Sequence, residues 1–438
     1  MASVIRSVQE LTEQAAALSL AFPVEPGLAV LGERVGIGNK TAKNRLVCQA
    51  MEGCDGTARG LPNELTYRRY LRLAAGGAGI IWFEATAVLP EARANPRQLY
   101  INEANLDAFK RIAEDIRETA VRATGEAPLL VMQLTHSGRY SKPEGRPAPL
   151  IVCHNPLFEK EQLLPESCVV TDGYLEKVTE ALVNAAALAE KAGFDGADIK
   201  CCHRYLNSEL LSAYLRPGKY GGCFENRTRL LRESAAGAMQ ACGRDFIVTS
   251  RLNAYDGFPY PYGFGVSEAG GLAFDKTEAA LLLKALAGLG MKLVNITMGN
   301  PYVNPHVNRP FAVGPYPAPE PPLAGVHRML EGTAALKAEA GGMKLICSAL
   351  SFLGSAAPHA AAGYIKAGGF DFAGFGRTAF AYPDFANDIL QTGGMAQQKC
   401  CICCSKCSEI MRAGGTPGCV IRDKETYLPI YNAYCGRK

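Results

Sequence analysis

The sequence has no marked excess of charge of either sign. Its 438 residues include 46 Lys and Arg and 42 Asp and Glu, which gives a formal net charge of +4. A chain that binds nucleic acid or an anionic membrane through its charge carries a far less even balance. We therefore expect neither nucleic acid nor a membrane as a partner.

Long apolar runs are also missing. No stretch of 18 consecutive apolar residues occurs, so the sequence contains no candidate transmembrane helix. Residues 15–22 are apolar, but Glu10 and Glu13 precede them and no clear small-residue cleavage site follows. A secretory signal has basic residues before its apolar core and such a site after it. We expect a cytoplasmic protein.

The sequence also lacks the cysteine spacing of a small domain held together by disulfides. Such domains are short and secreted, whereas this chain is long and six of its 16 cysteines lie between residues 400 and 419. This clustering favours a metal site in a reducing, oxygen-poor setting. The residues alone do not separate a structural zinc site from a cubane iron–sulfur cluster, because four cysteines make either.

Short apolar segments alternate with helical patterns along most of the chain. The predicted strands lie within 46–51, 79–88, 129–134, 196–199, 246–252, 293–297, 344–348 and 372–375. Each is followed by a predicted helix. Strands joined by crossover helices form parallel sheets, and eight such units close into a barrel. The fold class we predict is therefore α/β, a (β/α)8 TIM barrel.

An open, doubly wound sheet is the alternative to the barrel. No Gly-rich dinucleotide fingerprint opens a helix after the first predicted strand, which favours the barrel. We divide the chain into an N-terminal lead-in (1–40), the barrel (41–395) and a cysteine-rich C-terminal segment (396–438).

The residues at the predicted strand ends indicate the kind of ligand. Active groups of such barrels come from the carboxyl ends of the strands. The fourth strand stops in the cluster Lys200, Cys201, Cys202, His203, Arg204 and Tyr205. Neither paired carboxylates for hydrolysis nor a serine nucleophile elbow stands out. Amides, cations and glycines suit a planar, phosphorylated cofactor, with Gly376 and Arg377 at its phosphate.

These blocks of sequence resemble the old yellow enzyme family of FMN oxidoreductases. The resemblance runs in order from about residue 28 to about residue 425 and rests on Asn44–Val47, Gln133–Arg139, Gly193–Gly196, Tyr220–Arg227 and Gly374–Arg377. More closely, the chain is similar to the iron–sulfur branch that includes 2,4-dienoyl-CoA reductase, trimethylamine dehydrogenase and bacterial bile-acid or steroid oxidoreductases. In that branch the barrel carries a C-terminal iron–sulfur segment, which would correspond to residues 396–438.

The resemblance implies a set of cofactor contacts. The backbone of Ala50 and Met51 would lie beside the isoalloxazine ring, and the amide of Gln133 would pair with the pyrimidine edge. Arg251 would stand near N1 and C2=O, where negative charge accumulates in reduced flavin. Gly376 and Arg377 would hold the phosphate, and Ser348 at the seventh strand end is a further expected cofactor contact.

The resemblance also implies catalytic roles for the fourth strand end. Lys200 and His203 occupy the positions of a pair that binds the substrate carbonyl oxygen, and Tyr205 matches the family's proton-donating tyrosine. Lys200 departs from the usual histidine, and its ammonium is a longer, more mobile point charge. The trimethylamine dehydrogenase branch ties its flavin to a first-strand cysteine. Glu52 stands at that position here, so we expect non-covalent FMN.

Two sets of four cysteines fit the cluster that the resemblance implies. The first set, which matches the family pattern CIxCxxC, is Cys401, Cys404, Cys407 and Cys419. The second set, which has the spacing of the dienoyl-CoA reductase branch, replaces the first two by Cys400 and Cys403. We prefer the first because it keeps three thiolates within one tight loop. The resemblance favours [4Fe–4S] over zinc.

The function implied is an FMN- and [4Fe–4S]-dependent oxidoreductase that reduces an activated C=C bond by hydride transfer from flavin N5. The bond would belong to an enone, an enoate or an enoyl-CoA. Long loops at 140–170, 253–275 and 299–325 predict a roomy apolar pocket and a bulky apolar substrate of steroid or bile-acid type. Two alternatives stay open: a dehydrogenase or demethylase of the amine-dehydrogenase type, and an electron-transfer subunit of a larger complex.

The expected electron donor follows from the C-terminal part of the chain. Larger family members carry a further FAD- and NAD(P)H-binding module there, whereas 19 residues follow Cys419 in this sequence. We therefore expect electrons from a separate redox protein, or from NAD(P)H that binds directly over the flavin. The sequence leaves a homo-oligomer open.

Overall fold

A closed barrel of eight parallel strands forms the centre of the computed structural model, which describes residues 3–436. Its strands are β3 (Leu46–Cys48), β4 (Ile80–Ala87), β5 (Leu129–Thr135), β6 (Gly196–Ile199), β7 (Ile247–Asn253), β8 (Leu293–Thr297), β9 (Lys344–Cys347) and β10 (Phe372–Phe375). Strand β10 pairs with β3 and closes the barrel, with Ala373 opposite Leu46. The predicted fold class is confirmed, and β6, β8 and β10 have the predicted bounds.

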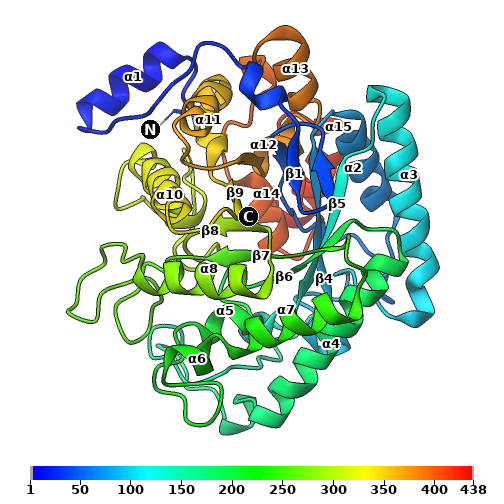
Figure 1. Ribbon diagram of the computed structural model, residues 1–438, viewed down its shortest axis with the longest axis vertical. Helices are drawn as coiled ribbons and strands as arrows, with labels where there is room; N and C mark the ends of the chain where they lie inside the picture. The colour runs from blue at the N-terminus through cyan, green and yellow to red at the C-terminus, as the bar shows by residue number, and fades with distance from the viewer. Residues whose placement is uncertain (1–2, 437–438) are drawn as a thin grey trace.

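Helices surround the strands in an outer ring (Figure 1). The longer ones are α2 (Glu64–Ala75), α3 (Leu106–Thr124), α4 (Asp172–Lys191), α7 (Arg229–Ala241), α8 (Thr277–Leu289), α10 (Pro322–Lys337), α11 (Ala357–Lys366) and α13 (Phe385–Thr392). In α3, Phe109, Ile112 and Ile116 recur at helical spacing and are completely buried. Within residues 3–436, none of the helices combines the length and apolar character that crossing a bilayer requires.

Further helices follow several strands at the carboxyl end of the barrel or lie in the C-terminal segment. They are α5 (Leu206–Leu210), α6 (Phe224–Arg227), α9 (Pro305–Asn308), α12 (Arg377–Ala381), α14 (Lys406–Arg412) and α15 (Lys424–Cys435). Helices α6 and α7 are separate, and Thr228 lies between them. The Thr228 hydroxyl donates to the Phe224 carbonyl at 2.8 Å, a side-chain bond that competes with helix continuation.

The N-terminal lead-in contains α1 (Val8–Ala17) and a hairpin that the sequence pattern did not reveal. The hairpin joins β1 (Val35–Ile37) to β2 (Lys40–Ala42) through Gly38, which has a positive φ of 59°. A Gly-Asn pair between short strands is a hairpin signal. Apolar side chains of β1 and β2 belong to the same buried cluster as the first residues of several barrel strands, so the hairpin closes the amino-terminal end of the barrel. The division at residues 40/41 and 395/396 stays a prediction.

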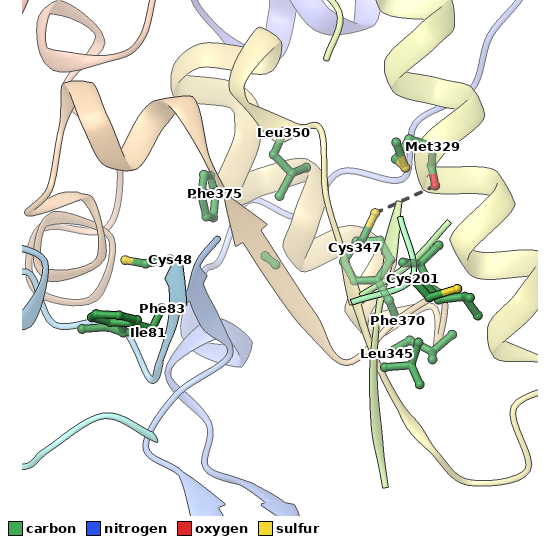
Figure 2. Packing of buried hydrophobic residues seen from close by; sticks show 14 of the residues in the cluster. Cys48, Ile81, Phe83, Cys201, Met329, Leu345, Cys347, Leu350, Phe370 and Phe375 are labelled. Carbon is green, nitrogen blue, oxygen red and sulfur yellow. Dashed lines mark hydrogen bonds between the residues drawn. The ribbon is translucent and has the colours of Figure 1, made fainter. Parts of the chain in front are cut away.

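A second apolar layer fills the space between the strands and the helices. Figure 2 shows part of it, with Ile81 and Phe83 beside Cys48, and Phe370 and Leu345 near Cys347. Cys48 packs here as a small apolar side chain, and burial raises the pKa of its thiol to about 12. The apolar core thus occupies the amino-terminal end and the flanks of the barrel, which leaves the carboxyl end for polar groups.

A buried ion cluster fixes the loop that follows β3. The guanidinium of Arg69 binds Asp55 and also Glu84, at 2.5 Å, and the exposed fractions of the three side chains are 5%, 3% and 1%. The second Glu84 oxygen accepts the backbone N–H of Gly53 at 2.7 Å. This cluster ties α2 and β4 to the residues beside Met51.

Replacement of Arg69 by Met should strongly destabilise the protein. The change leaves two buried carboxylates without their cation, and such a loss costs about 3–5 kcal/mol. The melting temperature of the purified protein measures the effect. Arg34→Met is the control, because the Arg34–Glu126 ion pair is exposed and should contribute little. Equal melting temperatures for the two variants would contradict this account of the loop.

Candidate active site

The carboxyl ends of the barrel strands surround one cleft of about 160 Å³. All the residues predicted to contact the cofactor or the substrate line this cleft. They are Ala50, Met51, Gln133, Lys200, His203, Tyr205, Arg251, Ser348, Gly376 and Arg377. The structure therefore brings the predicted strand-end residues together, while their individual roles stay predictions.

Asp198 organises the polar floor of the cleft. Its carboxyl group accepts the side-chain amide of Gln133 at 2.6 Å and the indole N–H of Trp82 at 2.8 Å. It also accepts the backbone N–H of Arg251 at 2.6 Å. Burial raises the pKa of Asp198, and these donors oppose the shift. Because the Gln133 amide nitrogen is engaged by Asp198, its carbonyl oxygen is the atom left to accept a bond from a ligand.

Several buried side-chain nitrogen atoms in the cleft lack hydrogen-bond partners. Among residues 3–436, Arg251 Nε, Arg377 Nη1 and His203 Nε2 are buried and make no hydrogen bond. Such groups are costly unless a ligand satisfies them. Oxygen-rich, anionic groups are the natural partners of guanidinium donors. The donor set therefore fits a phosphorylated, planar cofactor with electron-rich carbonyl oxygens.

The end of β6 carries the reactive side chains in a strained turn. His203 and Arg204 have positive φ angles of 65° and 57°, which non-glycine residues rarely adopt. Burial lowers the pKa of His203 well below its usual range, and the charges of Arg251 and Lys200 lower it further. The ammonium of Lys200 lies 3.8 Å from the centre of the Tyr205 ring. Neutral imidazole, ammonium and phenol therefore face one cavity.

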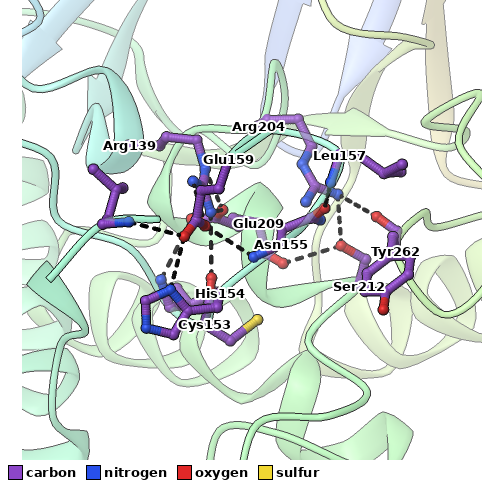
Figure 3. Close-up of polar contacts among 12 residues, drawn as sticks. Arg139, Cys153, His154, Asn155, Leu157, Glu159, Arg204, Glu209, Ser212 and Tyr262 are labelled. Carbon is purple, nitrogen blue, oxygen red and sulfur yellow. Dashed lines mark hydrogen bonds and ion pairs between the residues drawn. The ribbon is translucent and has the colours of Figure 1, made fainter. Parts of the chain in front are cut away.

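A network of buried ion pairs holds this turn from below (Figure 3). The Arg204 guanidinium donates to Ser212 Oγ at 2.6 Å, to the Tyr262 carbonyl at 3.1 Å and to Asp256 at 2.8 Å. Nearby, Arg139 binds Glu209 at 2.5 Å. These fixed charges give a physical reason why the strained conformation of the turn persists.

His136, a residue near the third strand end, does not line the cleft. Its Nε2 lies 2.8 Å from the Tyr174 hydroxyl, and its Nδ1 accepts the backbone N–H of Gly138 at 3.1 Å. Burial lowers the pKa of His136 to about 4, so its ring is neutral at physiological pH. His136 braces the loop after β5.

Sequence reasoning missed Tyr302 and gave Glu52 no part in the chemistry. Tyr302 follows β8 in a Pro-rich loop, and its hydroxyl lies 2.8 Å from that of Tyr205. Burial raises the pKa of the Glu52 carboxyl, and the nearby charge of Lys200 opposes the shift. An Asn-Pro-Tyr stretch in a loop carries no periodicity, so no sequence signal pointed to Tyr302.

The clustered cysteines lie against one side of the cleft. A small cavity is lined by Cys401, Cys403, Cys404, Cys407 and Cys419, together with Arg377 and Phe380. Cys400 does not line it, and its thiol is directed to the Ala396 carbonyl at 3.5 Å. Backbone N–H groups donate to the sulfurs of Cys401 (from Cys403, 3.4 Å) and Cys419 (from Arg422, 3.3 Å). Such bonds stabilise thiolates.

The cysteine cavity and the cleft share a wall. Cys407, Arg377 and Phe380 line both. Among residues 3–436, no three His, Cys, Asp or Glu side chains already converge on one point as the ligands of a single metal ion do. The segment is held to the barrel by Asp423, which binds Arg68 at 2.7 Å and also binds Arg72.

The chain is similar to proteins that reduce or oxidise small molecules. It is 29% identical over 236 residues to an NADPH dehydrogenase of Clostridium acetobutylicum, a match that covers 53% of this chain and 65% of that protein. The chain thus spans less than two thirds of the length of this relative.

Two solved structures share the fold. A 2-naphthoyl-CoA reductase in complex with 2-naphthoyl-CoA is 19% identical, has a TM-score of 0.72 and aligns over 93% of this chain and 58% of its own. A histamine dehydrogenase from Rhizobium sp. 4-9 is 19% identical, has a TM-score of 0.68 and aligns over 91% of this chain and 53% of its own. Residues 32–307 match the NADH:flavin oxidoreductase / NADH oxidase family, and with the flavin-type cleft described above the chain belongs to this family.

Proposed function

We propose that this protein is an FMN-dependent oxidoreductase that reduces an activated C=C bond conjugated to a carbonyl group. The observation that carries the proposal is the single cleft in which unpartnered buried cations face the neutral His203 and the protonated phenol of Tyr205. Family membership supports the flavin. The direction and the substrate follow from the charges and protons of the cleft.

The residues that would hold FMN come from the ends of three strands, β5, β7 and β10. Gln133 and Arg251 would meet the pyrimidine part of the ring, and Arg377 with the backbone of Gly376 would meet the phosphate. Gly374 has no room for a side chain, since a Cβ there would lie 2.1 Å from Gln49 Nε2. When bound and reduced, FMN supplies a hydride for the substrate.

The end of β6 would bind and protonate the substrate. Lys200 and His203 can both donate to a carbonyl oxygen, which stabilises the negative charge that develops there when the alkene accepts a hydride. Burial raises the pKa of Tyr205 well above its usual range, so the phenol keeps its proton until the substrate carbon needs it. We propose reduction rather than amine oxidation, because Lys200 and Arg251 would repel an ammonium substrate.

Tyr205→Phe should abolish most of the reductase activity. Loss of the phenolic proton removes general acid catalysis, so kcat for reduction of a small enone such as 2-cyclohexenone should fall about 10²–10⁴-fold. The amount of bound flavin and the rate of its reduction by NADPH should change little, because the variant keeps the aromatic ring of residue 205 and loses only the hydroxyl. Steady-state and stopped-flow absorbance measure both steps. An unchanged kcat would refute the proposed role of Tyr205.

Arg251→Met should make the bound flavin harder to reduce. The guanidinium stabilises the anionic reduced ring, and a charged hydrogen bond of about 1.5–3 kcal/mol corresponds to a shift of about 30–60 mV toward negative potential in a two-electron couple. A dye-coupled reductive titration gives the potential. Arg244→Met, at an exposed position, is the control that should leave the potential unchanged.

We further propose that residues 396–438 carry a [4Fe–4S] cluster held by Cys401, Cys404, Cys407 and Cys419. All four line one cavity, whereas the alternative set requires Cys400, which points elsewhere. Each cysteine of a cubane binds a different iron, so its ligands surround a cavity and do not meet at one point as zinc ligands do. Cys407 in the shared wall supports electron exchange with the flavin.

The two cysteine sets predict opposite results for two variants. Cys404→Ser should lose most of the iron and acid-labile sulfide from protein purified without oxygen, while Cys400→Ser should retain about four of each per chain. Retention in Cys404→Ser with loss in Cys400→Ser would show that the alternative set is the correct one. A wild-type protein with zinc and no iron would refute the cluster itself.

The donor we propose is NADPH or NADH bound directly over the flavin. The C. acetobutylicum relative is named an NADPH dehydrogenase, which supports this choice over a separate redox protein. Anaerobic addition of each nucleotide to the oxidised protein, followed by loss of flavin absorbance, tests it.

A further inference from the structure

Tyr302 stands in the wall between the cleft and a second cavity. The second cavity has a volume of about 750 Å³ and is formed by three loops around Asn95, Tyr140 and Ala413. Tyr302 and Glu52 line both cavities. Neither the cofactor contacts nor the carbonyl-binding pair uses this second space.

The phenol of Tyr302 is the hydrogen-bond partner of Tyr205. Their hydroxyl oxygens are 2.8 Å apart, and among residues 3–436 no other group hydrogen-bonds to the Tyr205 hydroxyl. The Tyr302 ring is held in place by stacking on Tyr140, with centroids 4.2 Å apart and planes at 27°. Asn300 braces both, because it accepts the Tyr302 backbone N–H and donates to the Tyr140 hydroxyl, each at 2.8 Å.

A buried proton donor has to be reprotonated after every turnover. Tyr205 is only 2% exposed, so its phenolate has little direct contact with bulk solvent. Burial raises the pKa of both phenols, so a phenolate formed at either position is a strong base that takes up a proton. Tyr302 is half-buried and reaches the second cavity, so it connects the donor to a space outside the reaction cleft.

We propose that Tyr302 relays a proton from the second cavity to Tyr205 after each reduction. This inference rests on the proposed function, in which the alkene receives a hydride at one carbon and the Tyr205 proton at the other. The O–H bond of Tyr302 then breaks as that of Tyr205 re-forms, and solvent in the second cavity returns a proton to Tyr302. No electrons move in this step, so each turnover consumes one hydride from reduced flavin and one solvent proton.

The relay predicts a split between the first turnover and the later ones. In Tyr302→Phe, Tyr205 begins protonated, so reduced enzyme mixed with 2-cyclohexenone in a stopped-flow instrument should reoxidise its flavin within about threefold of the wild-type rate. Steady-state kcat with NADPH should fall at least about tenfold, because regeneration of the donor becomes slow. The solvent deuterium isotope effect on kcat should rise in the variant.

Matched variants separate a relay from a structural role. Tyr434→Phe removes an exposed hydroxyl that lines the same cavity and, among residues 3–436, makes no hydrogen bond to Tyr302, so kcat should stay within about twofold of wild type. Tyr302→His restores a group that can accept and donate a proton, and should recover at least about half of the lost kcat. Equal losses of the first and later turnovers in Tyr302→Phe would overturn the relay.

The outcomes also distinguish this inference from the proposed function. If Tyr205→Phe is slow in both the first and later turnovers while Tyr302→Phe matches wild type throughout, the relay is wrong and the reductase stands. If Tyr302→Phe abolishes the first turnover and Tyr205→Phe does not, Tyr302 is itself the donor and the relay is wrong. If the wild-type protein reduces no enone although its flavin is reduced by NADPH, the proposed function fails, and the relay with it.

Discussion

Burial of positive charge at the carboxyl end of the barrel is the constraint on which the site depends. Lys200, Arg251 and Arg377 are all buried, and none of them forms an ion pair within residues 3–436. An unpaired buried charge costs several kcal/mol, so folding tolerates this set only where a ligand offsets that cost. Because the same donors suit a phosphate, electron-rich carbonyls and a developing oxyanion, one electrostatic feature accounts for the proposed cofactor and the proposed reaction.

The rest of the fold makes that burial sustainable. The hairpin β1–β2 and the apolar residues that begin the strands fill the opposite end of the barrel with apolar side chains. Rigid ion pairs under the β6 turn hold His203 and Arg204 in a backbone conformation that they would not adopt alone. Contacts that stabilise the fold thus surround the cleft, whereas the unpaired charges and the strained backbone that destabilise it lie at the cleft itself.

The sequence predicted what depends on local pattern and missed what depends on tertiary contact. Strand β6 ends in polar residues directly after an apolar run, and this local pattern is enough to place Lys200, His203 and Tyr205 at a strand end. Asp198 is a charged residue inside that apolar run, and the sequence gives no reason for it. The structure does, because Trp82 and Gln133 donate hydrogen bonds to its carboxyl group. Tyr302 lies nearly a hundred residues from Tyr205, and the spacing of neither gives a sign of the other. The two cysteine sets share Cys407 and Cys419, and their other two members are shifted by one residue. Spacing alone could not decide between them.

The position of the cysteine segment has an electrostatic consequence for the whole site. Arg377 lines both the cysteine cavity and the cleft, and Arg309 lines the cleft. Burial lowers the pKa of the Arg377 guanidinium, but the nearby cysteine thiols outweigh burial and raise it. A cluster bearing thiolates would therefore neutralise part of the positive charge that the cleft buries. If the proposed cluster is present, it supplies a share of the anionic compensation as well as electrons. Stability of the C-terminal segment and occupancy of the cleft would then be coupled, because each satisfies cations that they share.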